Sequence, residues 1–440
     1  MLQTGFARVD ITPYLGASLE GYYNFRGAEG ILDPLQANAV AFDNGEKKAV
    51  IIGIDLIGIH QSFAKELREA VGQAAGIPME AVFLCCTHTH LGPGICDSRG
   101  KKSNEAYHPF LSQRLQDVAV MAFRDLAPTT MSYTRGEAKD VAFLRRFRMK
   151  DGSIRTNPGL QNPDIAEPIG ECDESSSLLI LTREGKPEIG IVNFQVHPDV
   201  IGGKMMSADY PGFVRRTYER MIPDSRCLYI NGAQGNLNHI DVRLPKGPVA
   251  GGYGRSRYMG EKIAMSVIAN RHLAQPLEGE EIGYLQKALE VTYNNGLPEE
   301  MEEFLAIFKR YEEVGDVKLV FPEGSPYQGM VKTTMVAKAQ RIHSLMDLPD
   351  TSTIPLTALR VGGFALATLP GEPFNEIGAA IKAGSPIPLT MVSCCANGYE
   401  GYFPTTDCFS EFSYETATAN YRAETANDMI AGSLELLKQL

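Results

Sequence analysis

The stretch ANAVAFDNGEKKAVIIGID, residues 37–55, carries the pattern that decides the fold. Two runs rich in apolar and β-branched residues flank an Asp-Asn-Gly turn, which predicts an antiparallel hairpin whose second strand ends on Asp55. A helix is expected over 63–73, and an apolar strand over 81–86 precedes the loop THTHLGPG at 87–94. The expected order is therefore hairpin, helix, strand and polar loop.

The same order occurs twice more along the chain. A second hairpin pattern ends on His197 and is followed by a helix, a strand and the loop NGAQGNLN at 231–238. A third ends on Glu372 and leads to the loop ANGYEGYFPTT at 396–406. The three units share a pattern and not a sequence, so a common geometry and a chance resemblance are both open. If the geometry is common, the hairpin ends and the loops gather along one rim of the sheets.

These elements define the expected fold class and domain organisation. We expect an α/β fold with mixed, largely antiparallel sheets covered by helices. In residues 297–348 apolar positions recur at helical spacing among dense charges, which predicts a helical insertion. No linker-like segment divides the chain, so residues 1–440 are expected to form one catalytic domain that carries this insertion.

The composition excludes several classes of protein. Hydrophobic residues make up 44% of the 440 residues and charged residues 22%, as in a globular protein with a substantial core. A net charge of −11 argues against nucleic-acid binding, and the lack of an apolar run of roughly 18 residues argues against stable membrane insertion. The start of the sequence shows no signal-peptide pattern, and the eight cysteines show no disulfide-type spacing. We expect a cytoplasmic protein with reduced cysteines; the oligomeric state is left open.

Two histidines stand in the motif THTH, directly after an apolar strand and before a Gly-Pro-Gly turn. In an extended segment His88 and His90 point to the same face, about 7 Å apart. Two imidazoles so placed can bind one metal ion, or one can bind the metal while the other contacts substrate. A pair of hydrogen-bonded core histidines is the alternative interpretation.

The ends of the other two hairpins add side chains that commonly bind metals. His197 ends one of them and Glu372, held between two prolines, ends the other. Two imidazoles and a carboxylate are the usual protein ligands of a catalytic zinc ion. Tyr399 and Tyr402, in the following loop, could ligate such an ion or donate to an oxyanion. Asp55, at the end of the first hairpin, is expected to accept a hydrogen bond from a ligand histidine or to cap the next helix.

The motifs of the chain, taken together and in their order along the sequence, resemble those of the neutral/alkaline non-lysosomal ceramidase family. The resemblance extends over most of the chain. The shared stretches are AxVDITP (7–13), THTHxGPG (87–94), NFxVHP (193–198), GNL (235–237), LPGE (369–372) and GYFPTT (401–406). Each motif alone is weak, but the combination is specific. The resemblance implies a ceramidase-like catalytic domain, in a short form without the immunoglobulin-like C-terminal domain of that family.

The resemblance also implies a set of metal ligands. In this family one zinc ion is held by the first histidine of THTH, the histidine of VHP, the glutamate of LPGE and a tyrosine of the GY…TT loop. The matching residues are His88, His197, Glu372 and Tyr402. Tyr399 lies close by and competes with Tyr402 for the last position.

Further active-site residues follow from the same resemblance. His90 matches a family residue that stabilises the substrate or an intermediate, and Tyr414, in the stretch SYET, matches a later active-site tyrosine. An active-site arginine of the family falls within LRRFR, where Arg145 and Arg146 compete and Arg146 is the preferred candidate.

The chain departs from the family at Asn238, where ceramidases carry a serine that is a proposed nucleophile. Asparagine cannot form an ordinary acyl-enzyme. The expected function is therefore zinc-dependent hydrolysis of an amide in a small-molecule substrate, with metal-activated water as nucleophile and Asn238 as a site residue. Two alternatives stay open: a zinc-dependent hydrolase of a polar ester, lactone or sugar derivative, and a non-catalytic, ceramidase-like scaffold that binds a metal.

Overall fold

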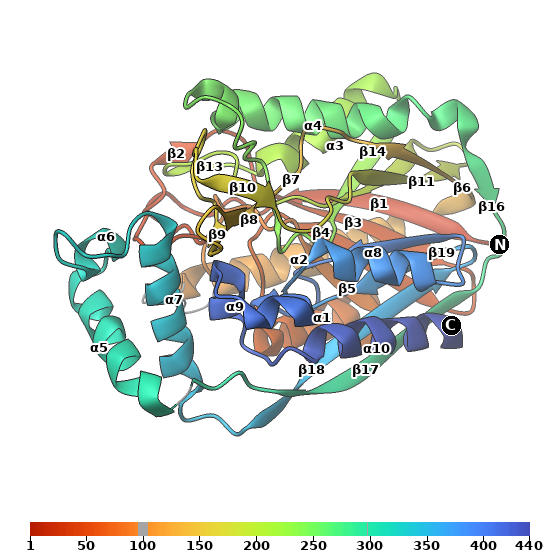
Figure 1. Cartoon of the computed structure of the whole chain (residues 1–440). Coiled ribbons are helices and arrows are strands. Elements are labelled where there is room, and N and C mark those ends of the chain that lie inside the picture. The colour runs from red at the N-terminus through yellow and green to blue at the C-terminus, as the bar shows by residue number, and fades with distance from the viewer. Residues whose placement is uncertain (96–103, 297) are drawn as a thin grey trace.

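The fold is built around two β-sheets, as a computed structural model of the chain shows for residues 1–95, 104–296 and 298–440 (Figure 1). The larger sheet has nine strands, with β16 (Gln275–Leu277) paired to β6 outside the main order. The strands in that order are β14 (Ser225–Asn231), β12 (Glu188–Phe194), β11 (Ser175–Arg183), β6 (Ala127–Glu137), β1 (Gln3–Asp10), β3 (Gln36–Asp43), β4 (Lys48–Ile54) and β5 (Val82–Cys86).

The second sheet and several short pairings complete the β structure. The four-stranded sheet runs β17 (Ile282–Thr292), β18 (Thr351–Val361), β19 (Phe364–Thr368) and β21 (Leu389–Ser393). Short ladders join β20 (Glu372–Pro373) to β22 (Tyr402–Phe403), β15 (Leu237–Asn238) to β7 (Phe143–Leu144), and β13 (Met205–Met206) to β2 (Gly30–Ile31). A three-stranded sheet contains β10 (Ile165–Pro168), β8 (Arg146–Met149) and β9 (Ile154–Thr156).

The described residues form ten α-helices. They are α1 (Gln61–Ala75), α2 (His108–Arg124), α3 (Asp209–Met221), α4 (Gly252–Ile268), α5 (Pro298–Val314), α6 (Val317–Val320), α7 (Met330–Leu345), α8 (Asn375–Gly384), α9 (Tyr414–Thr418) and α10 (Thr425–Gln439). Of these, α1, α2, α3, α4, α8 and α10 pack on the outer faces of the two sheets. The expected class, a mixed α/β fold with largely antiparallel sheets, is confirmed. Helices α5 to α7 lie beside the two sheets, at the edge of the molecule far from both chain ends (Figure 1).

The three sequence units share one geometry. In each, a hairpin of antiparallel strands is followed by a helix and by a strand that pairs in parallel with the second hairpin strand. The sets are β3-β4-α1-β5, β11-β12-α3-β14 and β18-β19-α8-β21. The common geometry left open by the sequence is therefore confirmed.

Alternating side chains place each unit between two apolar layers. On β4, Val50 and Ile52 face helices α1 and α2, whereas Ala49 and Ile51 face a core shared by both sheets. This alternation follows from the two-residue repeat of a strand, because successive side chains point to opposite faces. The shared core takes one face from every unit, so the sheets pack face to face and the helices close the outside.

The last strands of the three units meet where they end. The Asn231 side chain at the end of β14 donates to the carbonyl of Thr87 after β5 (3.1 Å). The backbone N–H of Cys394 donates to the carbonyl of Asn231 (3.0 Å), and that of Cys86 to the carbonyl of Cys395 (3.3 Å). These bonds tie the three strand ends in a closed ring and place the loops that follow them next to each other.

Asp55 takes neither of its two expected roles. Its carboxylate forms a buried two-point ion pair with Arg215 of α3 (3.0 and 2.6 Å) and accepts from the Thr87 hydroxyl (3.2 Å). Helix α1 begins at Gln61, several residues later, and no side chain caps it. The aspartate instead joins the first unit to the helix of the second.

No helix in the described part of the chain is long and apolar enough to cross a membrane. Seven cysteines are free, and the eighth, Cys96, lies outside the described residues. Four of the seven form the adjacent pairs Cys85-Cys86 and Cys394-Cys395, which are buried where the strands meet.

We predict that all eight cysteines are thiols in protein purified without oxidants. Burial raises the pKa of Cys85 to about 12 and that of Cys395 well above its ordinary value, so these groups are poor nucleophiles in the folded protein. Thiol titration of denatured, unreduced protein should therefore count eight, while the native protein should react more slowly. Six or fewer thiols after denaturation would contradict the prediction.

Candidate metal centre and active site

Four predicted ligand side chains come together at the ends of the units. His88 follows β5, His197 follows β12, and Glu372 begins β20 shortly after β19. Tyr402 begins β22, which pairs in parallel with β20 so that Glu372 and Tyr402 are direct partners. All four are buried, with His88 and Glu372 only 1% exposed. The rim predicted from the sequence thus contains these four residues.

Backbone carbonyls fix the orientation of both imidazoles. Nδ1 of His88 lies 2.6 Å from the carbonyl oxygen of Ile57, and Nδ1 of His197 lies 2.9 Å from that of Leu237. A carbonyl oxygen only accepts hydrogen bonds, so each Nδ1 must carry the proton. In the neutral form of each ring, Nε2 then presents its lone pair to the interior of the site.

The two lone pairs meet the carboxylate of Glu372. Its Oε2 lies 2.9 Å from Nε2 of His197 and 3.4 Å from Nε2 of His88, and Tyr402 Oη lies 3.2 Å from Nε2 of His197. Two ligands of a tetrahedral zinc ion with bonds of roughly 2.0–2.1 Å lie about 3.3 Å apart. Oε2 of Glu372 is buried with no hydrogen-bond partner among the described residues and faces the two imidazoles, so the residues present fit a metal ion.

His90 adds a third imidazole beside these two. His88, His90 and His197 each offer a nitrogen, and these nitrogens all lie within 4.8 Å of one another. Both ring nitrogens of His90 are buried and form no hydrogen bond with the described residues, although the Asp199 carboxylate lies 3.6 Å from Nδ1. The chain therefore contains a buried three-histidine group that could hold a metal ion, with His90 also free to contact a ligand.

The loop that carries His88 and His90 is held in an uncommon backbone conformation. His88 has a φ of 71°, in the left-handed region that residues with a side chain rarely adopt. Next to the imidazole, Gly21 has a φ of 107°, and a Cβ there would lie 2.5 Å from Nδ1 of His90. Glycine at position 21 is thus required for the close approach, and the strain at His88 is of the kind found at functional sites.

Tyr399 and Tyr402 hold different positions in the site. The Tyr399 hydroxyl donates to Oε1 of Glu372 (2.5 Å), and its ring stacks on His88 with centroids 6.1 Å apart. Tyr402 instead places its hydroxyl beside Nε2 of His197. Of the two competing tyrosines, Tyr402 lies where a fourth ligand would be, and Tyr399 orients the carboxylate.

Burial sets the protonation state of the site. It lowers the pKa of His197 to about 4, helped by the nearby Arg145 guanidinium, so this imidazole is neutral at pH 7. Burial alone would raise the pKa of Glu372, but His88 and His197 hold it well below the ordinary value. Burial raises the pKa of Tyr402 well above 10, although Arg145 opposes the shift. Neutral imidazoles and an ionised carboxylate are the forms that bind metal ions.

Of the two candidate arginines, the structure places Arg145 at the site. Its Nη1 lies 3.5 Å from Nε2 of His197, its Nη2 donates to the carbonyl of Gly235 and its Nε pairs with Glu415 (2.7 Å). Arg146 points to the other side of the segment and pairs with Glu411 (2.8 Å). Successive side chains of an extended segment face opposite ways, so only one of the two can reach the histidines.

Tyr414 and Asn238 lie beside the centre rather than in it. The Tyr414 ring packs edge-on against Tyr402 with centroids 5.6 Å apart. The Asn238 side chain donates to Asn157 (2.5 Å) and accepts from the backbone N–H of Ile240 (2.9 Å). Its amide is thus occupied by neighbouring loops.

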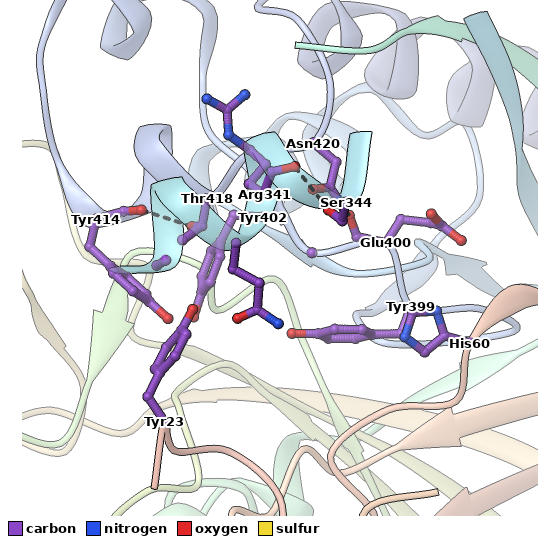
Figure 2. A pocket seen from close by; sticks show the side chains of 13 residues that line it. Tyr23, His60, Arg341, Ser344, Tyr399, Glu400, Tyr402, Tyr414, Thr418 and Asn420 are labelled. Carbon is purple, nitrogen blue, oxygen red and sulfur yellow. Dashed lines mark hydrogen bonds between the residues drawn. The ribbon is translucent and has the colours of Figure 1, made fainter. Parts of the chain in front are cut away.

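A pocket opens onto the tyrosine side of the centre (Figure 2). It contains about 680 Å³ of empty space, part of it open to solvent, and it borders Tyr399, Tyr402 and Tyr414. Residues of α7 and Tyr23 form its opposite wall. A second pocket of about 770 Å³ also reaches Tyr414 and is lined by the 154–159 and 328–331 segments.

Sequence reasoning missed several contributors to the site. The carbonyls of Ile57 and Leu237 carry no side-chain signal, because any residue supplies a carbonyl. Tyr22 donates to Asp199, whose carboxylate lies 3.6 Å from Nδ1 of His90. Asp199 follows the predicted ligand His197 by two residues. This position next to a strand end was the feature of the sequence that could have indicated a role for Asp199 at the site.

Comparison with solved structures confirms the fold suggested by the sequence motifs. A neutral ceramidase from Pseudomonas aeruginosa has a TM-score of 0.73 and 19% identity, over 100% of this chain and 75% of that one. A ceramidase complexed with C2 has a TM-score of 0.73 and 18% identity, over 99% of this chain and 74% of that one. No protein-family model and no curated protein matches the sequence. The chain therefore has a neutral-ceramidase-like fold.

We predict that the purified protein binds about one zinc ion per chain and that His88→Ala or Glu372→Ala abolishes this binding, because each removes a ligand from a closed, buried set. Metal analysis after dialysis measures the stoichiometry. His272→Ala is the matched control, since it removes an exposed imidazole from the 3₁₀ helix Arg271–Leu273. Equal zinc content in all three variants would contradict the assignment, provided that circular dichroism shows each to be folded.

Proposed function

We propose that the protein is a zinc-dependent hydrolase that cleaves an amide bond in a small-molecule substrate. The observation that carries this proposal is the convergence of two carbonyl-oriented imidazoles and the Glu372 carboxylate in a buried site. The shared fold with two ceramidases supports it, because a ceramidase hydrolyses an amide. His88, His197, Glu372 and Tyr402 would hold the metal.

Zinc bound by this set would polarise a carbonyl group and lower the pKa of a water molecule toward 7. The chain's own residues have separate tasks. Tyr399 holds one carboxylate oxygen of Glu372, which leaves the other directed at the two imidazoles. The carbonyls of Ile57 and Leu237 retain the Nδ1 protons and keep both rings in place.

Three further side chains can act on a bound substrate. The ring nitrogens of His90 form no hydrogen bond with the described residues, so one of them can donate to an oxyanion. The Arg145 guanidinium, 3.5 Å from Nε2 of His197, places a fixed positive charge beside the same region. Tyr414 lines both pockets, so its phenol can orient substrate between them.

The nucleophile in this proposal is water. Asn238 has no nucleophilic oxygen of the kind that serine supplies, and its amide is bonded to Asn157 and Ile240. No covalent acyl-enzyme is therefore part of the mechanism.

The substrate could instead be a polar ester, lactone or sugar derivative, and one observation favours this second candidate. The pocket beside Tyr402 and Tyr414 is lined mainly by side chains that carry polar atoms. The same metal centre could hydrolyse an ester, because both reactions attack a carbonyl. Comparing amides, esters and lactones of the same acid decides between the two.

A cytoplasmic location is part of the proposal. The seven described cysteines are free although two pairs of them are adjacent, as expected in a reducing compartment. The formal charge of −11 also fits a small-molecule substrate rather than a nucleic acid.

Zinc-loaded protein should hydrolyse members of a panel of amides, and a chelator should abolish the activity until zinc is restored. The metal supplies both the polarised carbonyl and the activated water, so its removal leaves no route to hydrolysis. Release of amine, measured over time, gives the rate. A protein that binds zinc and still cleaves no amide, ester or lactone would support the non-catalytic scaffold instead.

Asn238→Ala should lower kcat/KM by at most about tenfold, because the one hydrogen bond between loops that it removes is worth roughly 0.5–1.5 kcal/mol. Asn157→Gly is the matched control: it removes the other half of the same bond and suits the φ of 49° at this position. The two variants should therefore have similar rates. A loss of several hundredfold in Asn238→Ala alone would show that Asn238 acts directly on the substrate.

A further inference from the structure

Helix α7 forms one wall of the pocket that opens onto the candidate metal centre. Gln340 and Ser344 of this helix line the pocket opposite Tyr399 and Tyr402. Ala337, one turn before Gln340, packs against Tyr402 and Tyr414 in a small apolar cluster. A helix of the 297–348 segment thus contacts the tyrosines that border the metal ligands.

The wall is anchored at several points, so its side chains are held in place. The Tyr311 hydroxyl on α5 donates to the carbonyl of Tyr23 (2.8 Å), which fixes the Tyr23 segment beside the helices. Arg341 of α7 donates to the carbonyl of Asn294. Its guanidinium points away from the tyrosines in Figure 2 and serves the backbone.

The lining of the pocket is polar and carries no formal net charge. Of its 13 lining residues, only Ala337 and Gly401 lack a side-chain polar atom. Arg341 and Glu400 contribute opposite charges, and the Glu400 carboxylate already accepts from the Tyr421 hydroxyl (2.8 Å). A long alkyl chain would offer no hydrogen bond to the Gln340 amide, which has none within the described residues, and burying that amide unpaired costs binding free energy. A neutral, polar ligand suits this lining.

Aromatic faces accompany the polar groups. Tyr23, Tyr399, Tyr402 and Tyr414 line the pocket, and Figure 2 shows the hydroxyl ends of Tyr23, Tyr402 and Tyr414 turned toward a common region. A phenol offers a flat apolar face and a hydrogen-bonding edge. Ring-shaped polyols present C–H faces and hydroxyl groups, so this combination matches a hydroxylated ring.

Gln340 is the side chain best placed to recognise such a ring. It is half-buried and lines the pocket, and no hydrogen bond joins its amide to the part of the chain that the structure describes. An amide offers two donors and one acceptor, which suits neighbouring hydroxyl groups.

The pocket and the metal centre share side chains. The Tyr402 hydroxyl lies 3.2 Å from Nε2 of His197, and the Tyr399 hydroxyl bonds to Glu372. Two side chains that line the pocket therefore also contact the candidate metal ligands.

We propose that this pocket binds a neutral hydroxylated ring as the amine half of the scissile amide, with Gln340 as a specificity-determining residue. The substrate class is thus an N-acylated amino sugar or a closely similar cyclic polyol, and not an amide with a long alkyl amine. This inference rests on the proposed hydrolase function, since it names the substrate of the same site.

The test measures how fast the zinc-loaded protein hydrolyses two amides of acetic acid, N-acetylglucosamine and N-acetylhexylamine. We expect kcat/KM to be at least tenfold higher for the sugar amide. Gln340→Leu should reduce that preference by roughly threefold to tenfold, mainly through KM, because it removes hydrogen bonds to the ring. Gln439→Leu is the matched control: it makes the same exchange at the end of α10, far from α7 in Figure 1, and should leave the preference unchanged.

Binding separates this inference from the proposed function. His88 does not itself line the pocket, so calorimetry with the inactive variant His88→Ala should still detect N-acetylglucosamine, more weakly in the double variant with Gln340→Leu. If N-acetylglucosamine binds but the wild-type protein hydrolyses no amide, ester or lactone, the hydrolase proposal is refuted and the pocket assignment is supported. Equal kcat/KM for the two amides, a preference unaffected by Gln340→Leu, or no binding of the sugar would overturn the substrate class, whether or not other amides are cleaved.

Discussion

Two backbone hydrogen bonds determine what the candidate metal centre can bind. Because the carbonyls of Ile57 and Leu237 retain the Nδ1 protons of His88 and His197, both Nε2 lone pairs are directed at Glu372. Without these bonds either ring could turn or change tautomer, and a proton could satisfy the carboxylate. With them, the buried acceptors can be satisfied together by a cation. The roles proposed for Arg145, Tyr399 and the pocket all depend on that arrangement of acceptors.

The repeated unit explains why residues distant in sequence reach one place. His88, His197 and Glu372 come from three different units, yet each follows the end of a strand at the same rim. The ring of bonds through Thr87, Asn231 and the Cys394-Cys395 pair fixes the strand ends against one another. The sheets therefore set the positions of the candidate ligands, whereas the loops and α7 form the pocket and can determine which substrate it accepts.

Most of the fold and the convergence of His88, His197, Glu372 and Tyr402 could be predicted because both depend on local patterns. The DNG turn defined the first hairpin, and each metal-type side chain stood next to a strand end, where sequence order gives spatial position. Arg145 and Arg146 could not be separated, because the side that faces the centre depends on the twist of a short segment. The bond from Tyr399 to Glu372 and the wall formed by Gln340 depend on contacts between distant segments, which leave no local pattern.

The central claim is that Nε2 of both histidines and the Glu372 carboxylate bind one metal ion. Anomalous diffraction at the zinc absorption edge, from crystals of the zinc-loaded protein, tests it most directly. The account predicts one strong peak about 2.0–2.2 Å from Nε2 of His88, Nε2 of His197 and an oxygen of Glu372. A peak bound through either Nδ1 atom, or one located between His90 and Asp199 away from Glu372, would contradict it.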